Sequence, residues 1–310
     1  MTSTAAHVLA PNPPHYVWDN ALEPKLRVGS GETVTFDTRD AGDLSFNLSS
    51  TTADLAAYVF RGHPLTGPVY VEGAQPGDTL QIDILEVKPA PHGWTAILPG
   101  MGLLSEDFTE PYLHMWDLSS GTHATFGDRI RIPLEPFCGV MGVAMAEPGE
   151  HPTLPPSRVG GNVDIRQLVA GASLYLPVEV TGALFSVGDA HAAQGDGEVC
   201  VTAIEMSSTT TLRFTVRKDL AVQETQFSTP GLRTRGSAGA SYVTTANGPD
   251  LKENAKNAVR YMISHLQREY GLSREDAYLL CSVAVDLKIS QIVDAPNWIV
   301  SAFLPMELFT

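Results

Sequence analysis

The stretch SLYLPVEVTGALFSVGDAHAAQGDGEVCVTAIEM, residues 173–206, indicates both the fold and the working site of this chain. Residues 173–187 are rich in β-branched and aromatic side chains, and residues 199–206 alternate loosely between apolar and polar side chains. Both patterns predict β-strands. Between them stand four ionisable residues among glycines and alanines: Asp189, His191, Asp196 and Glu198. We therefore predict a hairpin or sheet corner that carries buried charge.

The spacing of these four residues indicates what the charge does. Side chains two apart on an extended strand share one face, so Asp189 can point with His191, and Asp196 with Glu198. The surrounding glycines allow sharp bends and close approach of a ligand. This pattern favours metal ligation, general acid/base chemistry, or both. The alternative is a solvent-exposed turn, because Gly, Asp and Ala are ordinary loop residues.

Outside this stretch the chain also reads as β structure. Most of its 22 prolines and 27 glycines precede residue 246 and separate short apolar runs. These runs include TVTFDT, PVYVEG, TLQIDILEV, RIRIPL, GVMGVAM and LRFTVRK. Many short strands with turn residues between them predict an all-β sandwich or barrel.

The last quarter of the chain has a different pattern. Residues 248–271 carry apolar side chains at helical spacing and end at a glycine, which predicts a helix. Ser273 followed by Asp276 resembles a capping box and predicts a second helix. Two strand-like runs follow, LKISQIVD and NWIVSAFLP. We expect residues 1–245 to form a β-rich catalytic region, with room for two intertwined β subdomains, and residues 246–310 to form the helix pair and the strands that close the fold.

Composition limits the classes of partner. The chain has 310 residues, 43% hydrophobic and 18% charged, and a formal net charge of −15. It offers no basic stripe for nucleic acid, and no apolar run reaches the roughly 20 residues that span a membrane. Three cysteines make no disulfide framework, and residues 1–20 do not resemble a signal peptide. We expect a reducing compartment, the cytoplasm.

Other stretches place polar residues at strand ends. FDTRDAGD offers Asp40, and GGNVDIRQL offers Asn162 and Asp164; a capped turn and a plain loop are the respective alternatives. The chain has no Gly-x-Ser-x-Gly elbow and no zincin or nucleotide-binding motif. Cys200 lies in an apolar run, so we interpret it as a core cysteine on a strand and not as a nucleophile.

Taken in order, these stretches resemble the acetamidase/formamidase family. The matching motifs are VWDN, ETVTFDTRDA, TGPVYVEGAQPGDTLQIDIL, RIPLEPFCGVMGVA, GGNVDIRQL, GASLYLPV, GALFSVGDAHAAQGDGEVCVTAIE and DLKISQIVD, and they cover nearly the whole chain. Two positions depart from the family pattern. His63 stands where the family often has Asn, which makes it a poor candidate ligand. Gln194 stands where the family commonly has Met, which alters the polarity of the pocket.

The resemblance implies a mainly β fold, a jelly-roll-like sandwich with a barrel-like part, plus a smaller C-terminal α+β portion. It also implies hydrolysis of short carboxamides, formamide or acetamide, to carboxylate and ammonia, with activity falling as the acyl chain lengthens. A divalent metal is implied near the acidic motif, with zinc expected and calcium as a second site. We further expect a homo-oligomer, with a dimer favoured.

Amide hydrolysis suggests a role for each candidate. We expect Asp189 and His191 to bind the metal, with a third carboxylate from Asp40 or Asp164. Glu198 then serves as general base and later as acid, and His191 belongs to the catalytic group. Asp196 orients a neighbour or replaces a ligand. Two side chains are expected to bind substrate: Asn162 and Gln194.

Two other functions fit the same residues. A non-catalytic jelly-roll module would use the acidic loops for structural calcium, which needs six or more oxygen ligands and no imidazole. A hydrolase of a larger amide, or of another C–N bond, would keep the fold and change the pocket. Release of ammonia from formamide, with and without a chelator, distinguishes these functions.

Overall fold

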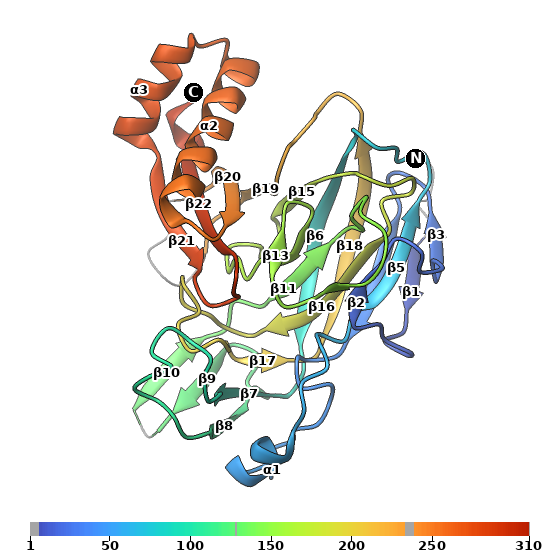
Figure 1. Ribbon diagram of the computed structural model, residues 1–310, viewed down its shortest axis with the longest axis vertical. Helices are drawn as coiled ribbons and strands as arrows, with labels where there is room; N and C mark the ends of the chain where they lie inside the picture. Colours follow the sequence, from blue (N-terminus) through green and yellow to red (C-terminus); the bar gives the residue numbers. More distant parts are fainter. Residues whose placement is uncertain (1–5, 128, 233–238, 310) are drawn as a thin grey trace.

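The protein is a stack of two large β-sheets with a helix pair at one end (Figure 1). The computed structural model describes residues 6–127, 129–232 and 239–309. The prediction of a mainly β fold is confirmed. Within the described ranges neither large sheet closes into a barrel, so the architecture is an open sandwich.

The first sheet joins strands from the whole length of the chain. Apolar and polar residues alternate along β4 (Thr33–Thr38), which buries Val34 and Phe36 completely. Among the strand pairs of this sheet that the structure describes, only β1–β4 is parallel. The order is β1 (Ala6–Leu9), β4, β18 (Ser208–Arg217), β6 (Thr79–Pro89), β15 (Ser173–Pro177), β19 (Gln226–Thr229), β20 (Ser241–Gly248), β22 (Trp298–Pro305) and β21 (Asp286–Gln291).

The second sheet contains two fully buried central strands, β11 (Phe137–Gly142) and β16 (Phe185–His191). The order is β13 (Pro156–Ser157), β14 (Gly160–Asn162), β11, β16, β17 (Glu205–Met206), β7 (His92–Ile97) and β8 (Tyr112–Asp117), while β5 (Thr66–Val71) pairs with β16 and β3 (Leu26–Val28) pairs with β5. Two small ribbons pair β9 (His123–Phe126) with β10 (Ile130–Pro133), and β2 (Val17–Trp18) with β12 (His151–Pro152).

Aromatic side chains join the two sheets. Phe36 and Phe214 of the first sheet meet Phe185 of the second, edge to face, with their ring centroids 6.1 and 5.0 Å from that of Phe185. All three are fully buried. Each such pair contributes about 0.5–1.5 kcal/mol beyond the burial of its surface. This contact fixes β16, the strand that carries Asp189 and His191, against the first sheet.

The helices in the described part of the chain are α1 (Thr52–Ala57), α2 (Leu251–Tyr270), α3 (Arg274–Ala284) and the short η1 (Met306–Leu308). The predicted C-terminal helices are confirmed, with their caps. Asp250 accepts hydrogen bonds from the first turn of α2, Gly271 ends it with a φ of +66°, and Ser273 caps α3. In the described ranges, no helix has both the length and the apolar character needed to cross a bilayer.

The C-terminal strands β21 and β22 continue the first sheet through the pairing of β22 with β20. They therefore share a sheet with strands from the first 245 residues. The division at residue 245 stays a prediction about domains.

The predicted strand over residues 199–206 is wrong except at its end. Glu198 and Val201 have φ values of +47° and +71°, so the chain turns there and only Glu205 and Met206 pair as a strand. Cys200 therefore lies in a turn, half-buried, with its Sγ donating to the carbonyl of Thr202. The interpretation of Cys200 as a core residue on a strand was wrong.

Candidate active site

The site is built where β16 meets β17 in the second sheet. Asp189 and His191 both belong to β16, and the antiparallel register places Glu205 of β17 directly opposite His191. Gly139 of the neighbouring β11 leaves room for the group, because a Cβ at that position would lie 2.8 Å from the His191 ring and 2.4 Å from Asp164 Oδ1. A larger residue on β11 would close the site.

The His191 ring has a defined orientation. Its Nδ1 lies 2.8 Å from Gln194 Oε1, while Gln194 Nε2 donates to the Asp164 carbonyl at 2.7 Å. Since the amide nitrogen of Gln194 is used as a donor, its oxygen is the acceptor, and His191 Nδ1 carries the proton. The other ring nitrogen, Nε2, faces two carboxylates, with Glu205 Oε2 at 3.1 Å and Asp189 Oδ2 at 3.4 Å.

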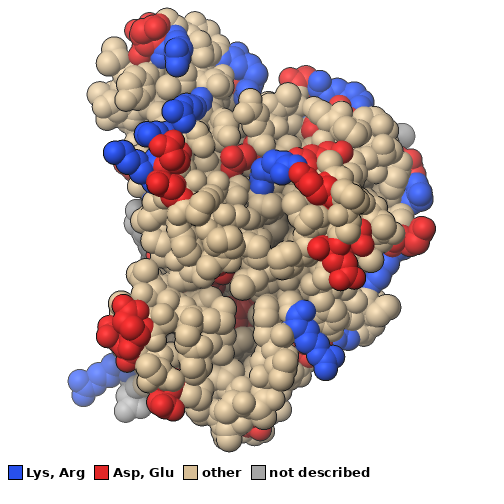
Figure 2. Space-filling view, in the orientation of Figure 1, with Lys and Arg blue, Asp and Glu red and all other residues tan. Residues whose placement is uncertain are grey.

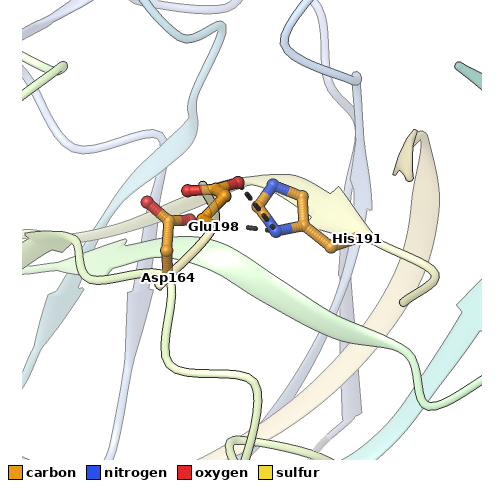
Figure 3. A group of neighbouring side chains, drawn as sticks. All are labelled: Asp164, His191 and Glu198. Carbon is orange, nitrogen blue, oxygen red and sulfur yellow. Dashed lines mark ion pairs between the residues drawn. The ribbon is translucent and has the colours of Figure 1, made fainter. Parts of the chain in front are cut away.

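Two groups of side chains have the geometry to hold a metal ion, and both include His191. One joins Asp189, His191 Nε2 and Glu205; the other joins Asp164, His191 and Glu198. Figure 3 shows the second group, in which both carboxylates lie 3.8–3.9 Å from Nδ1. Because Nδ1 is already bound to Gln194, only the Nε2 group leaves the lone pair of the imidazole available.

The Nε2 group also has unused ligand atoms. Within the described residues, His191 Nε2, Asp189 Oδ1 and Glu205 Oε2 are buried and make no hydrogen bond. Leaving buried polar atoms unpaired is costly, and native proteins rarely do so without a ligand, ion or water. One imidazole and two carboxylates form a three-ligand set that suits a divalent ion with an open position.

Five buried carboxylates lie in or beside these groups: Asp164, Asp189, Glu198, Glu205 and Asp294. Burial raises the pKa of Glu198 well above its ordinary value, and the charge of Asp164 adds to this. Burial likewise raises the pKa of Glu205 to about 8, although His191 opposes the shift. Burial and Asp164 raise the pKa of Asp294 well above its ordinary value. So many carboxylates cannot all ionise together without a cation.

In His191 and Asp189, the neighbouring charges outweigh burial and favour the charged form of the side chain. Burial disfavours the charge on each, but Glu205 and Asp189 raise the pKa of His191 well above its ordinary value. Similarly, despite burial, His191 and His63 hold the pKa of Asp189 well below its usual range. Without an ion, a proton on His191 supplies the positive charge of the group. A bound metal ion would replace that proton.

Backbone strain concentrates at the same place. Asp164, Asp189 and Glu198 have φ values of +44°, +51° and +47°, a region that L-residues rarely adopt. They are three of eight described non-glycine residues with positive φ. Such strain costs on the order of 1–3 kcal/mol per residue and clusters at functional sites.

The structure brings most of the sequence-predicted residues together, but not all. Asn162 lies at the cavity, where its Nδ2 donates to the Leu154 carbonyl and its Oδ1 is buried without a partner among the described residues. Asp40 lies outside both groups, behind Trp94, whose Nε1 donates to it. Asp196 is exposed and accepts from Gln167 Nε2, away from the groups.

Three site residues were not among the sequence predictions. Glu205 is the single acidic residue in the apolar run VCVTAIEM, and that position was the signal in the sequence. Its role became visible only from the pairing of β17 with β16, which places it opposite His191. Asp294 ends the DLKISQIVD motif and reaches the site from the loop between β21 and β22. His63 was set aside as a ligand, yet its Nε2 lies 3.7 Å from Asp189 Oδ2.

The carboxylates open into a cavity of about 410 Å³, whose lining includes Asp189, Glu198, Glu205 and Asp294. Figure 2 shows acidic side chains recessed in a hollow of the molecule. On the face shown, Lys and Arg form small separate groups next to Asp and Glu and do not form a basic stripe.

Three cysteines are free, and the fully buried one, Cys138, has its pKa raised to about 11 by burial.

Known proteins resemble this chain over most of its length. A model of the acetamidase/formamidase family matches residues 4–151 and 145–310. An acetamidase of Mycolicibacterium smegmatis is 32% identical, covering 63% of each chain, and a formamidase of Methylophilus methylotrophus is 26% identical, covering 80% of this chain and 77% of its own. The crystal structure of an acetamidase from Bacillus halodurans superimposes with a TM-score of 0.88 at 33% identity, covering 97% of this chain and 98% of its own.

Proposed function

Since this chain belongs to the acetamidase/formamidase family and is an amidase of short carboxamides, we propose that it hydrolyses formamide and acetamide to carboxylate and ammonia at the group around His191. The observation that carries this assignment is the group of Asp189, His191 and Glu205, buried together beside the cavity, each with an atom that makes no hydrogen bond to the described residues.

These three side chains would hold a divalent metal ion, and the imidazole and carboxylate donors suit zinc. When bound, such an ion polarises the amide carbonyl and lowers the pKa of water, which makes the water nucleophilic at neutral pH. Asp189 and Glu205 supply the negative charge, and Gln194 holds the His191 ring so that Nε2 faces the ion. Calcium at a second site stays a prediction.

Proton transfer falls to Glu198. It lines the cavity, lies outside the Nε2 group and is buried, so it is free to take a proton from the attacking water. It then returns the proton to the nitrogen as the C–N bond breaks and ammonia leaves. Asn162 Oδ1, buried at the cavity, is placed to accept a hydrogen bond from the NH₂ group of the substrate.

The calcium-binding module predicts a different donor set. Calcium takes six to eight oxygen ligands, whereas the Nε2 group has an imidazole at its centre.

The free cysteines favour a reducing compartment, and we retain the cytoplasm and a homodimer as proposals. Fractionation and sedimentation velocity would check them.

The test measures ammonia release from formamide and acetamide before chelation, after chelation and after zinc is restored. We expect turnover of at least one amide, its loss with chelator and its return with zinc. His191→Ala should lose zinc and turnover while it stays folded. His151→Ala, at the surface, is the matched control and should keep both. Full activity in metal-free protein contradicts the metal role, and no turnover of either amide contradicts the substrates.

A further inference from the structure

The cavity beside the carboxylates is much larger than the amides it is proposed to bind. Its volume is about 410 Å³. A water molecule, with one non-hydrogen atom, takes about 30 Å³ of liquid, so acetamide, with four, needs on the order of 100 Å³. Acetamide would therefore leave most of the cavity to water. Cavities of this size are typical of sites for larger ligands.

The cavity is lined by two kinds of side chain. Beside the carboxylates and Asn162, the lining includes the apolar and aromatic residues Leu55, Tyr58, Trp94, Leu98, Met101 and Leu154. Ordered water gains little from apolar walls, whereas an apolar group that displaces it is stabilised in proportion to its buried surface.

Two of the aromatic residues that line the cavity, Tyr58 and Trp94, have no polar atom available to a ligand. Tyr58 donates its hydroxyl to the Ala41 carbonyl, and Trp94 donates its Nε1 to Asp40 Oδ1. Both polar atoms are thus used within the protein, and burial raises the pKa of Tyr58 to about 12. Phe46 packs edge to face on Trp94, with ring centroids 5.0 Å apart, and holds the indole in place. This wall is a preformed apolar surface.

We propose that the cavity binds the apolar acyl group of larger primary amides, up to about the size of a phenyl ring, and that the enzyme hydrolyses them to the carboxylate and ammonia. The inference rests on the proposed function, because the same group at His191 would break the C–N bond and form the C–O bond with one water. It reverses the expectation that activity falls as the acyl chain lengthens.

Helix α1 offers a position at which the size of the cavity can be changed. It packs beside β8, where Thr52 Oγ1 accepts from the Leu113 backbone, and it contributes Leu55 and Ala56 to the cavity. Ala56 is exposed to solvent at the same time, so a larger side chain there can fill the cavity without disturbing the core. Ala53 lies on the same helix, exposed and outside the cavity lining.

The experiment compares kcat/KM for formamide, acetamide, butanamide, hexanamide and phenylacetamide, by ammonia release from the zinc-loaded enzyme. We expect kcat/KM to rise about fourfold per methylene and by about 10- to 100-fold from acetamide to phenylacetamide, as buried apolar groups require. In Ala56→Trp the ratio of kcat/KM for phenylacetamide to that for acetamide should fall at least tenfold. Ala53→Trp, the matched control, should keep the ratio.

Three results overturn the inference. Turnover of formamide and acetamide with kcat/KM falling as the acyl group grows would contradict it and leave the proposed function standing. An unchanged ratio in Ala56→Trp would show that the acyl group does not occupy the cavity beside α1. Absence of turnover with every amide would instead refute the proposed function, and this inference with it.

Discussion

Gln194→Leu tests the orientation of the His191 ring. The substitution removes the acceptor of His191 Nδ1 and the donor to the Asp164 carbonyl. Each of the two buried groups that lose a partner costs about 1–3 kcal/mol, so the free energy of unfolding should fall by about 2–6 kcal/mol. The ring also loses the contact that directs Nε2 toward Asp189 and Glu205. Loss of such a supporting contact lowers metal affinity about 10- to 100-fold.

The assay is competition for zinc with a chromogenic chelator, together with chemical denaturation. Gln167→Leu is the matched control, because Gln167 is also buried but donates to Asp196, away from the metal group. It should lose stability and keep its zinc affinity. The sign of the change in zinc affinity decides between the two groups around His191. If Nδ1 is the true ligand, Gln194→Leu releases it and zinc binds more tightly, which would refute our assignment.

Three further predictions concern single side chains. Glu198→Gln should lower kcat/KM for acetamide by ~10²–10⁴-fold with zinc affinity retained, because it removes the titrating group and keeps the shape; loss of zinc would identify Glu198 as a ligand. Cys200→Ser should keep its turnover of acetamide, since the thiol donates to Thr202 in a turn and lies outside the cavity lining; an acyl-thioester trapped on Cys200 would contradict this. Burial lowers the pKa of His15 from 6.5 to about 4. Between these pH values the unfolded chain binds a proton at His15 and the native state does not. Stability should therefore fall as the pH falls from 6.5 to 4, by about 3 kcal/mol in total; equal pH dependence of unfolding in His15→Gln and the parent would rule this out.

The sequence by itself determined the class of fold and the centre of the site. Alternation of period two predicts strands because consecutive side chains on a strand point to opposite faces, and β4 follows that pattern. The same local geometry placed Asp189 and His191 on one face of β16. The helix caps at Asp250 and Ser273 depend only on neighbours a few residues away.

The tertiary structure alone decided which distant residues complete the site. Glu205 faces His191 because of the register between β16 and β17, and Asp294 comes from the loop between β21 and β22, about a hundred residues after His191. Asp40 accepts a hydrogen bond from Trp94 and lies outside the metal groups. Register and packing depend on how separate segments fill one core, and no local pattern encodes that. The volume of the cavity has the same origin, since its lining comes from α1, from strands of the second sheet and from loops far apart in the sequence.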